Sequence, residues 1–512
     1  MKKLSTISKI TLLLVFFFGL DKVVAFFRQV IIARQFGLSA ELDVFNVANN
    51  VPDMLFALIS GGALAMAFIP VLTEVLTKEG QRSAWTLFSR IANLAFVLTS
   101  ILAVVVAIFA HQLVRTNIGI APGFTDDQQT LVANLMRLNL IATVIFSISG
   151  LVMAGLQSNN HFLLPAMAPL FYNIGQIFGA LVLAPTQGYQ IGPIILPAIG
   201  LGVYGLVYGV LIGAALHLLV QLPGLIKYHY KWTPGFALGD PQVQKVLRLM
   251  GPRLLTMICI QLIFIVRDNL ASRLEAGSVS SLTYGWMVFQ VPETLIGTAI
   301  ATAMLPTLSE FFAREDKKSF VNAIENAVKV LMAVCLPVAV IFGLGLGPLL
   351  AAAFDFSGDG NMLLMNVTRG FMAGLLGQSL VEVFVRAFYS RQDARKPLIG
   401  ALTALGIYLI LGILLYRTLG APGISITDAI AYTIEAILLW FLLSKLLKEK
   451  IQFGSSLVRA LGSAVIAGGV IWGIMTYGTF LSPILRSIFA MGVGALAALP
   501  LIWKEVKLLA RL

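Results

Sequence analysis

Charged residues are scarce in this 512-residue chain, because Asp, Glu, Lys and Arg together make up only 12% of it. Soluble domains carry about 25% charged and about 45–50% apolar residues, whereas this chain is 58% apolar with a mean hydropathy of +0.90. The composition excludes an ordinary water-soluble protein. Since a bilayer-spanning helix needs about 20 mostly apolar residues, the sequence predicts an all-α, polytopic membrane protein.

Cysteine and histidine are also rare, and neither shows the spacing of a metal site. The two cysteines, Cys259 and Cys335, lie in separate apolar runs, so no disulfide framework is predicted. The sequence contains no P-loop, catalytic triad or metal-ligand cluster, and we therefore expect neither an enzyme nor a bound cofactor. The net charge of +12 comes from short loops between apolar runs, which argues against a nucleic-acid partner.

Apolar runs predict about fourteen transmembrane helices. The first run resembles a signal peptide, but no small-residue cleavage site follows it, so we expect it to be retained as a helix. The predicted spans are 10–34, 43–75, 84–110, 130–155, 162–184, 194–221, 246–272, 281–309, 321–344, 363–389, 396–416, 422–446, 456–478 and 484–503. The predicted domains are an N-lobe at 1–222, a cytoplasmic linker at 223–245, a C-lobe at 246–450 and two extra helices at 451–512.

The basic residues predict the orientation. With fourteen spans, about 23 lysines and arginines lie on the side of the two termini. Five lie in the opposite loops: Arg34, Arg115, Arg273, Arg417 and Arg486. Because cytoplasmic loops carry an excess of Lys and Arg, both termini are expected to be cytoplasmic.

Two copies of one pattern occur about 240 residues apart. FFRQVIIARQFG, from Phe26, matches IVRDNLASRLEAG, from Ile265; VPDML matches VPETL, and IPVLTE matches LPTLSE. Arg137 precedes a proline by 28 residues, and so does Arg369. Spans one to six and seven to twelve are therefore predicted to be parallel repeats, which in transporters enclose a central cavity. We expect Arg137 and Arg369, as matched positions, to have a structural role.

Ionisable residues inside a membrane normally face a cavity or a partner. The first helix carries Asp21, Lys22 and Arg28, and the two cations are candidate ligands for an anionic substrate. The alternative is neutralisation of Arg28 by Asp21 or Asp43, or snorkelling of the basic side chains to the interface.

The second helix carries Asp43, Asn49 and Asp53, for which helix capping or interhelical hydrogen bonding is as good an explanation as ligand contact. In the seventh helix, Arg267 is a further candidate for substrate binding and Asp268 for ion coupling. Adjacent residues on a helix project in different directions, so these two need not pair with each other.

Four further charges lie within predicted spans and are most simply interpreted as interhelical pairs. These residues are Glu293, Glu382, Arg386 and Glu435.

Several segments carry a family resemblance that covers essentially the whole chain. The segments FFRQVIIARQFG, LDVFNVANNVPDMLFALISGGALAMAFIPVLTE, GLQSNNHFLLPAMAPLFYNIGQ, LPTLSEFF and RAFYSRQDARKP resemble the MurJ (MviN) family of lipid II flippases. That family belongs to the multidrug/oligosaccharidyl-lipid/polysaccharide exporter superfamily. The resemblance implies a multi-pass protein of the bacterial inner membrane with a six-plus-six-plus-two arrangement of helices, the last two forming a groove for a lipid tail.

By this resemblance the substrate is the undecaprenyl-diphosphate-linked peptidoglycan precursor, moved from the inner to the outer leaflet by alternating access. Arg28 matches a cavity arginine of the family, Lys22 another basic position, and Asp43 the acid that opens the second helix. The family carries arginines where this chain has Phe56 and Met287.

The predicted substrate ligands are thus Arg28, Lys22, Asp43, Asn49 and Arg267. The expected partners are the lipid-linked precursor, membrane lipids and cell-wall synthesis proteins, and the chain is expected to act as a monomer. Transport would be driven by Na+, H+ or the membrane potential. Two other functions remain open: a cation-coupled exporter of another lipid-linked oligosaccharide or small amphiphile, which Phe56, Met287 and Asp268 favour, and a membrane scaffold for cell-wall synthesis.

Overall fold

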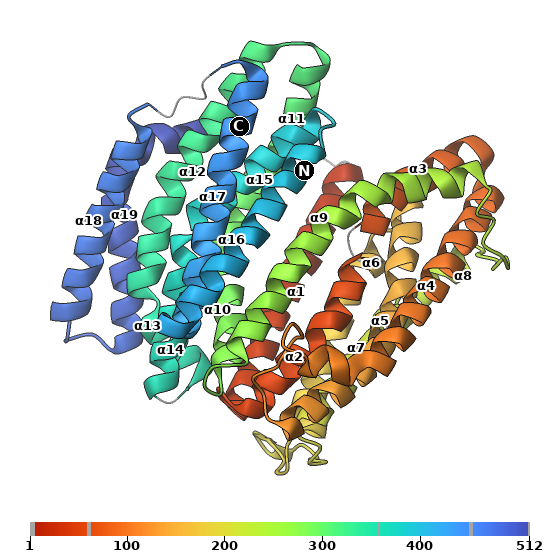
Figure 1. Ribbon diagram of the computed structural model, residues 1–512, viewed down its shortest axis with the longest axis horizontal. Helices are drawn as coiled ribbons and strands as arrows, with labels where there is room; N and C mark the ends of the chain where they lie inside the picture. The colour runs from red at the N-terminus through yellow and green to blue at the C-terminus, as the bar shows by residue number, and fades with distance from the viewer. Residues whose placement is uncertain (1–5, 59–62, 357, 450–453, 510–512) are drawn as a thin grey trace. The chain divides into compact units, whose positions relative to one another are not determined.

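A computed structural model describes residues 6–58, 63–356, 358–449 and 454–509. The chain divides into two compact units, Met1–Ile265 and Val266–Leu512, which are described separately below and are coloured along the sequence in Figure 1. Almost every described element is a helix, as the composition predicts.

Unit 1 contains the helices of the first repeat, a short hairpin and most of the helix that follows. Its elements are α1 (Thr6–Phe36), α2 (Ala40–Phe56), α3 (Ala63–Glu79), α4 (Gln81–Arg115), α5 (Asp126–Ser158), α6 (Leu163–Phe178), the π-helix η2 (Gly179–Leu183), β1 (Gln190–Ile191), β2 (Ile194–Ile195), α7 (Val203–Leu219), α8 (Leu222–Lys227) and α9 (Pro241–Ala271). The helix α9 runs on into unit 2.

Unit 2 contains the helices of the second repeat and two further helices. Its elements after α9 are α10 (Ser278–Glu293), the π-helix η3 (Thr294–Thr298), α11 (Ala299–Ala313), α12 (Lys317–Gly345), α13 (Gly347–Phe354), α14 (Gly358–Ala373), α15 (Leu375–Ser390), α16 (Arg395–Leu419), α17 (Ala421–Leu447), α18 (Ser456–Tyr477) and α19 (Pro483–Leu509).

Among the described residues, eleven helical segments are long and apolar enough to cross a membrane, or twelve if α14 and α15, which meet at 42°, form one span. The two remaining predicted spans, 10–34 and 43–75, coincide with α1 and with α2 and α3. Multi-pass architecture is therefore confirmed. The number fourteen is consistent with these helices and remains a prediction.

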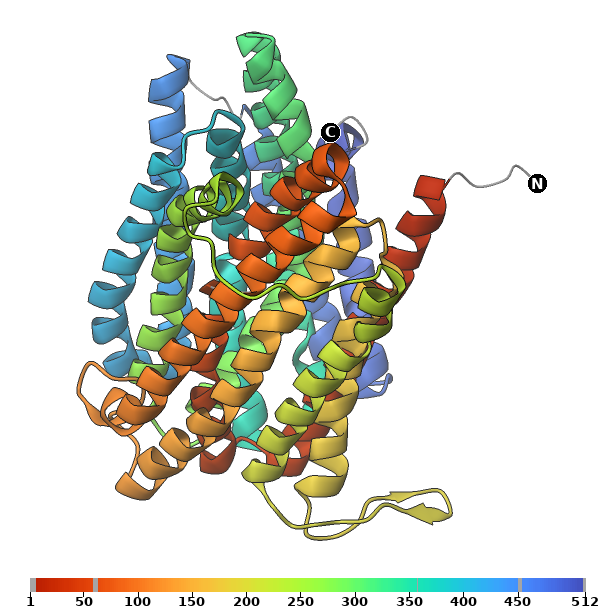
Figure 2. The ribbon, with the colours of Figure 1, turned by 90° about the vertical axis from the view of Figure 1, so that its right-hand side faces the viewer.

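The predicted sixth span, 194–221, starts too early. Residues 194–195 belong to a hairpin in which Gln190 pairs with Ile195, and α7 begins only at Val203. Figure 2 shows this hairpin extending beyond the ends of the helices of unit 1. The physical reason is the run of prolines and glycines before Val203: Gly192, Gly200 and Gly202 all have positive φ, which an α-helix does not accommodate.

The second span of each repeat is interrupted at the same place. In the first repeat α2 contains Pro52, and the π-helical residues Ala57 and Leu58 follow it. In the second repeat α10 contains Pro292, and η3 follows it. A proline lacks the N–H of the helical ladder, and π-helical turns inside helices occur often at functional sites. The matched VPDML and VPETL motifs therefore mark matched breaks.

The two repeat arginines make the same contacts in their own units. Arg137 donates from Nε to the Ala107 carbonyl at 3.0 Å and from a terminal nitrogen to Asn134. Arg369 donates from Nε to the Gly343 carbonyl at 2.8 Å and from a terminal nitrogen to an asparagine three residues earlier. Each arginine thus ties its helix to the third span of its repeat. The duplication is confirmed, and both arginines have the structural role expected of them.

The segment 228–240, within the predicted linker, lies along α4 of unit 1, and Figure 2 shows it crossing the helices as coil. Four side chains of α4 join the segment to this helix. The Trp85 indole donates to the Tyr228 carbonyl, and Ser89 accepts from the Thr233 N–H. Asn93 bonds Trp232, Thr233 and Gly235, and Arg90 forms an ion pair with Asp240. The start of α9 packs there as well, since Val243 and Val246 belong to the apolar core around α3 and α4. The linker is therefore an ordered part of unit 1.

The last two helices, α18 and α19, pack on α12 and on each other in unit 2 (Figure 1). Their shared core contains Ile341, Ala467, Ile471, Ala490 and Ala498. Many of their other apolar side chains are exposed, among them Val465 and Leu496, as suits helices that face lipid tails.

Candidate functional site

The candidate site in unit 1 starts from the polar residues of α1. Asp21 and Arg28 are seven residues apart and so lie on one stripe of the helix. Asn173 of the neighbouring helix α6 bridges them: the Arg28 guanidinium donates to Asn173 Oδ1 at 2.7 Å, and Asn173 Nδ2 donates to Asp21 Oδ1 at 2.7 Å. Asn173 is buried and Arg28 is half-buried. The amide therefore links Arg28 to Asp21 and helps to fix the position of the guanidinium.

Two further residues of unit 1 lie near the Arg28 guanidinium. Asp53 of α2 and Tyr172 of α6 both lie within electrostatic range of Arg28. Asp53 is exposed although it belongs to a spanning helix. Lys22 is exposed on α1 and interacts electrostatically with Asp21. The structure thus brings Arg28 and Lys22, two of the predicted ligands, into one polar region with carboxylates.

The other two predicted ligands of unit 1 have mainly internal contacts. Asp43, only 2% exposed, lies in the first turn of α2, whose first N–H groups include one bound by the Ser39 hydroxyl. Asn49 accepts a hydrogen bond from Asn139 of α5 at 2.6 Å and donates to the carbonyl one turn back. Asn49 thus joins α2 to α5, as the interhelical alternative supposed.

Phe56, at a position where the resembled family has an arginine, lies against aromatic rings. Its ring centroid is 5.2 Å from that of Phe146, which in turn is 5.1 Å from Tyr172 and 5.3 Å from His217. Aromatic pairs at these separations add about 0.5–1.5 kcal/mol beyond their burial. An apolar, aromatic cluster therefore extends from Phe56 to Tyr172, beside the arginine site.

The candidate site in unit 2 is drier. Arg267 is 8% exposed and Asp268 is 3% exposed, and the two pair with each other, with Nε 3.6 Å from Oδ1. Arg267 and Asp268 thus form an ion pair although adjacent side chains project from different sides of a helix. Asp428 of α17 is also buried; it accepts a hydrogen bond from the Tyr408 hydroxyl at 3.4 Å and lies within electrostatic range of Arg267.

Among the described residues, Glu293, Glu382 and Arg386 have local partners in place of the interhelical pairs expected of them, whereas the pairing expected of Glu435, which is buried in α17, stays a prediction. Arg386 forms an ion pair with Glu382 one turn earlier on the same helix, α15. Glu293 accepts hydrogen bonds from the hydroxyls of Thr294 and Thr298, which follow it directly in η3. Residues four apart on a helix face each other, so these charges are satisfied locally.

Sequence reasoning missed the residues that hold the two arginines. Asn173 is uncharged and lies in an apolar helix, so it carries no ionisable signal in the sequence. Asp428 did carry a signal, because it is one of two acids, with Glu435, in the 27-residue apolar helix α17. Within the described ranges no cluster of three metal-ligating side chains was found.

The two sites occupy corresponding positions, because Arg28 and Arg267 are the first arginines of the repeated segments. They differ in access: Arg28 is half-buried, whereas Arg267 is buried with two carboxylates nearby. A guanidinium offers permanently charged, bidentate donors for phosphate or carboxylate. The site in unit 1 can therefore bind an anion. In unit 2, the Arg267 guanidinium is instead occupied by the buried carboxyl groups of Asp268 and Asp428.

Comparison with known proteins agrees with this arrangement. The family model described as "Lipid II flippase MurJ" matches residues 32–489. A protein of Burkholderia cenocepacia named lipid II flippase MurJ is 27% identical over 480 residues, covering 92% of this chain and 89% of that protein. A probable lipid II flippase MurJ of Haemophilus influenzae is 27% identical over 482 residues, covering 88% of this chain and 90% of that protein.

Solved structures show the same fold at low sequence identity. A structure titled "Lipid II flippase MurJ, inward closed conformation" has a TM-score of 0.78 at 20% identity and covers 98% of this chain and 99% of its own. An inward-facing multidrug resistance MATE transporter of the MOP superfamily has a TM-score of 0.67 at 16% identity and covers 83% and 94%. With the family match over most of its length, this chain belongs to the lipid II flippase MurJ family.

Proposed function

We propose that this protein moves lipid II, the undecaprenyl-diphosphate-linked peptidoglycan precursor, from the inner to the outer leaflet by alternating access. The observation that carries the proposal is the family match over residues 32–489, and the arginine site on α1 supports it. A diphosphate-sugar headgroup cannot cross hydrocarbon unaided, since an isolated charge at the bilayer centre costs several kcal/mol. No bond is made or broken, so the activity is transport.

The proposed role of Arg28 is to bind the substrate diphosphate. Its guanidinium is held by Asn173 at 2.7 Å, which supports its role as a positioned donor for a phosphate oxygen. Lys22, exposed on the same helix, would add a second cation when the headgroup enters. Asp53 would favour release, because a carboxylate beside the arginine competes with the anionic substrate.

The proposed role of α18 and α19 is to contact the long lipid tail. Their exposed apolar side chains, including Val465, Trp472 and Leu496, support this role. We propose that both termini are cytoplasmic, on the side with the excess of basic residues, in the bacterial inner membrane. We also propose that the chain acts as a monomer, with cell-wall synthesis proteins as partners.

Ion coupling is proposed for the buried site in unit 2. Asp268 and Asp428 place two carboxyl groups beside the one guanidinium of Arg267, so the site offers carboxylate oxygens to a monovalent cation. A single H+ or Na+ is the simplest such ion. The 3–5% exposure of the two carboxylates supports this role, because an unbalanced charge in a dry site is costly. The membrane potential is the alternative driving force.

Complementation tests the proposed function directly. Cells depleted of their own lipid II flippase are expected to survive when they express this chain, and the Arg28→Ala variant is expected to fail at equal membrane abundance. Arg486→Ala is the matched control, because the Arg486 guanidinium donates to the Met475 carbonyl at the junction of α18 and α19. Failure of the well-expressed parent chain would instead favour an exporter of another amphiphile, for which the aromatic cluster at Phe56 is suited.

A further inference from the structure

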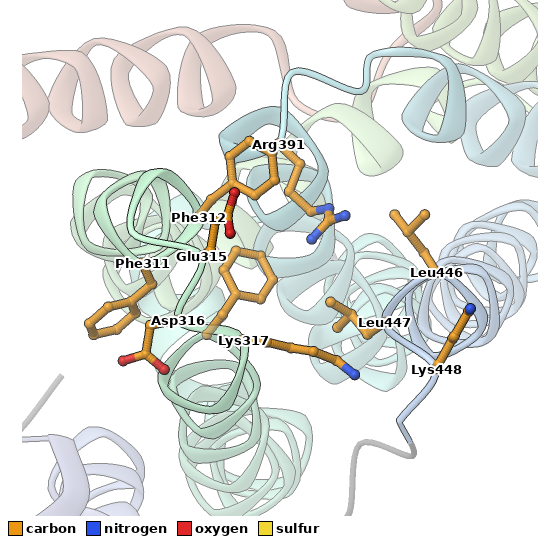
Figure 3. A pocket seen from close by; sticks show the side chains of 10 residues that line it. Phe311, Phe312, Glu315, Asp316, Lys317, Arg391, Leu446, Leu447 and Lys448 are labelled. Atoms are coloured by element: carbon orange, nitrogen blue, oxygen red, sulfur yellow. The ribbon is translucent and has the colours of Figure 1, made fainter.

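A cavity of about 310 Å³ lies at one end of unit 2 and plays no part in the sites described above. The cavity is formed where the end of α11, the start of α12, the residue after α15 and the end of α17 meet. Figure 3 shows its lining side chains, which are Phe311, Phe312, Glu315, Asp316, Lys317, Phe320, Arg391, Leu446, Leu447 and Lys448. The lining thus combines aromatic rings and leucines with three cations.

The arginine of this cavity is held by aromatic rings. The Arg391 guanidinium lies 4.9 Å from the ring centroid of Phe312 and 5.8 Å from that of Phe320. Such cation–π contacts orient a guanidinium and leave its N–H groups available to an anion. Figure 3 shows Arg391 and Lys317 extending from opposite sides toward Leu447.

The two lysines are accessible. Lys317 pairs with Glu449 at 2.9 Å, and its side chain is 46% exposed. Lys448, the C-cap of α17, has a left-handed backbone (φ 52°) and is exposed. Exposed lysines with long side chains can reach an entering anion at little cost.

The acids of the lining leave a positive excess. Asp316 accepts a hydrogen bond from the Ser319 N–H as the N-cap of α12, and Figure 3 shows its carboxylate directed away from Lys317 and Arg391. Among the described lining residues, Glu315 is thus the acid left to oppose Arg391 and Lys448. An anion is therefore the ligand that complements this cavity.

A cavity of similar size in unit 1 differs in chemistry. The cavity, of about 290 Å³, lies where α3 ends and α4 begins, and Arg90 in its wall is paired with Asp240. None of the described residues that line it is aromatic. The cation–π arrangement and the neighbouring leucines are therefore a feature of the unit 2 cavity, and they suit a ligand that has both a phosphate and an acyl chain.

We propose that this cavity binds the headgroup phosphate of an anionic phospholipid of the membrane, with Arg391, Lys317 and Lys448 as ligands and the phenylalanines and leucines against its glycerol and first acyl carbons. The end of unit 2 that bears it carries the basic residues of the proposed cytoplasmic side, so the lipid belongs to the inner leaflet. Basic pockets between helices at that level are typical sites for anionic headgroups. The site concerns bulk phospholipid and is separate from the proposed transport substrate.

Native mass spectrometry of the delipidated full chain tests the proposal, with phosphatidylglycerol as the probe. A lining variant with Lys317→Gln, Arg391→Gln and Lys448→Gln is compared with a control with Arg314→Gln, Lys318→Gln and Arg395→Gln. The control removes the same charge from exposed residues that do not line the cavity.

The lining variant is expected to bind the first phosphatidylglycerol about a hundredfold more weakly than the parent, at about fivefold, or about 1 kcal/mol, per removed cation. The control is expected to lose less than about threefold. Single Lys448→Gln, expected to lose about fivefold, serves if the triple variant does not fold. An equal loss in both triple variants would overturn the proposal, and so would equal binding of phosphatidylethanolamine. Complete displacement of the lipid by millimolar inorganic phosphate would assign the cavity to free phosphate instead.

Discussion

The hydrogen-bond chain from Asp21 through Asn173 to Arg28 predicts a specific energetic coupling. Asn173→Ala removes the amide that accepts from Arg28 and donates to Asp21, at 2.7 Å each. A hydrogen bond to a charged group contributes about 1.5–3 kcal/mol. If transport needs Arg28 in this position, the variant should flip lipid II about 10- to 100-fold more slowly than the parent, since each 1.4 kcal/mol is a factor of ten.

The assay is a double-mutant cycle on lipid II flipping in proteoliposomes. Because Asn173 acts through Arg28, the double variant with Arg28→Ala and Asn173→Ala should be no slower than Arg28→Ala alone. Asn139→Ala is the matched control, since Asn139 is also a buried amide but bonds Asn49. Its effect should add to that of Arg28→Ala. Additive effects of Asn173→Ala and Arg28→Ala would refute the positioning role.

Three further predictions concern stability. Arg137→Ala and Arg369→Ala should each lower the free energy of unfolding by about 1 kcal/mol for the lost bond to the preceding span, measured as a lower melting temperature, while the flipping rate of the folded fraction stays unchanged. Gly179→Val should lower the melting temperature, because a Cβ there would lie 2.6 Å from a backbone atom of α7, whereas Gly473→Val, with open space around it, should not. Asp316 accepts hydrogen bonds from the N–H and hydroxyl of Ser319, and these bonds lower the pKa of its carboxyl below 3.8. Hydrogen-exchange protection at the start of α12 should therefore hold at neutral pH and fall as the pH drops below about 4. An Asp316→Asn variant should remove that pH dependence.

The sequence contains enough information to predict the helices and the duplication. Apolar runs locate spans because a bilayer-spanning helix must be apolar along its length. Arg137 and Arg369 stand at matched positions of the two repeats, and each bonds a backbone carbonyl of the preceding span. The start of the sixth span was predicted too early, before Val203, because residues 194–201 form an apolar run in which the helix-breaking effect of the glycines does not show. Periodicity and hydropathy do not report where a loop leaves the membrane.

The contacts of the candidate site were harder to predict. Arg28 could be selected because an intramembrane charge is costly, but its partner Asn173 lies 145 residues away, and nothing in the spacing of either residue fixes which helices pack together. Asp268 and Arg267 were expected to point apart, yet a long guanidinium can bend back to its neighbour at 3.6 Å. Side-chain reach and helix packing, which are tertiary properties, determined these outcomes.

The most direct test of the proposed transport is the transfer of fluorescent lipid II across the membrane of proteoliposomes that contain this chain as their one protein. The purified protein is expected to accelerate the transfer, and Arg28→Ala is expected to slow it to a small residual rate. Arg486→Ala, which loses the bond between α19 and α18, is expected to retain the parent rate. Transfer at the rate of protein-free liposomes would contradict the proposed function, and equal transfer by the parent chain and the Arg28→Ala variant would contradict the role of Arg28.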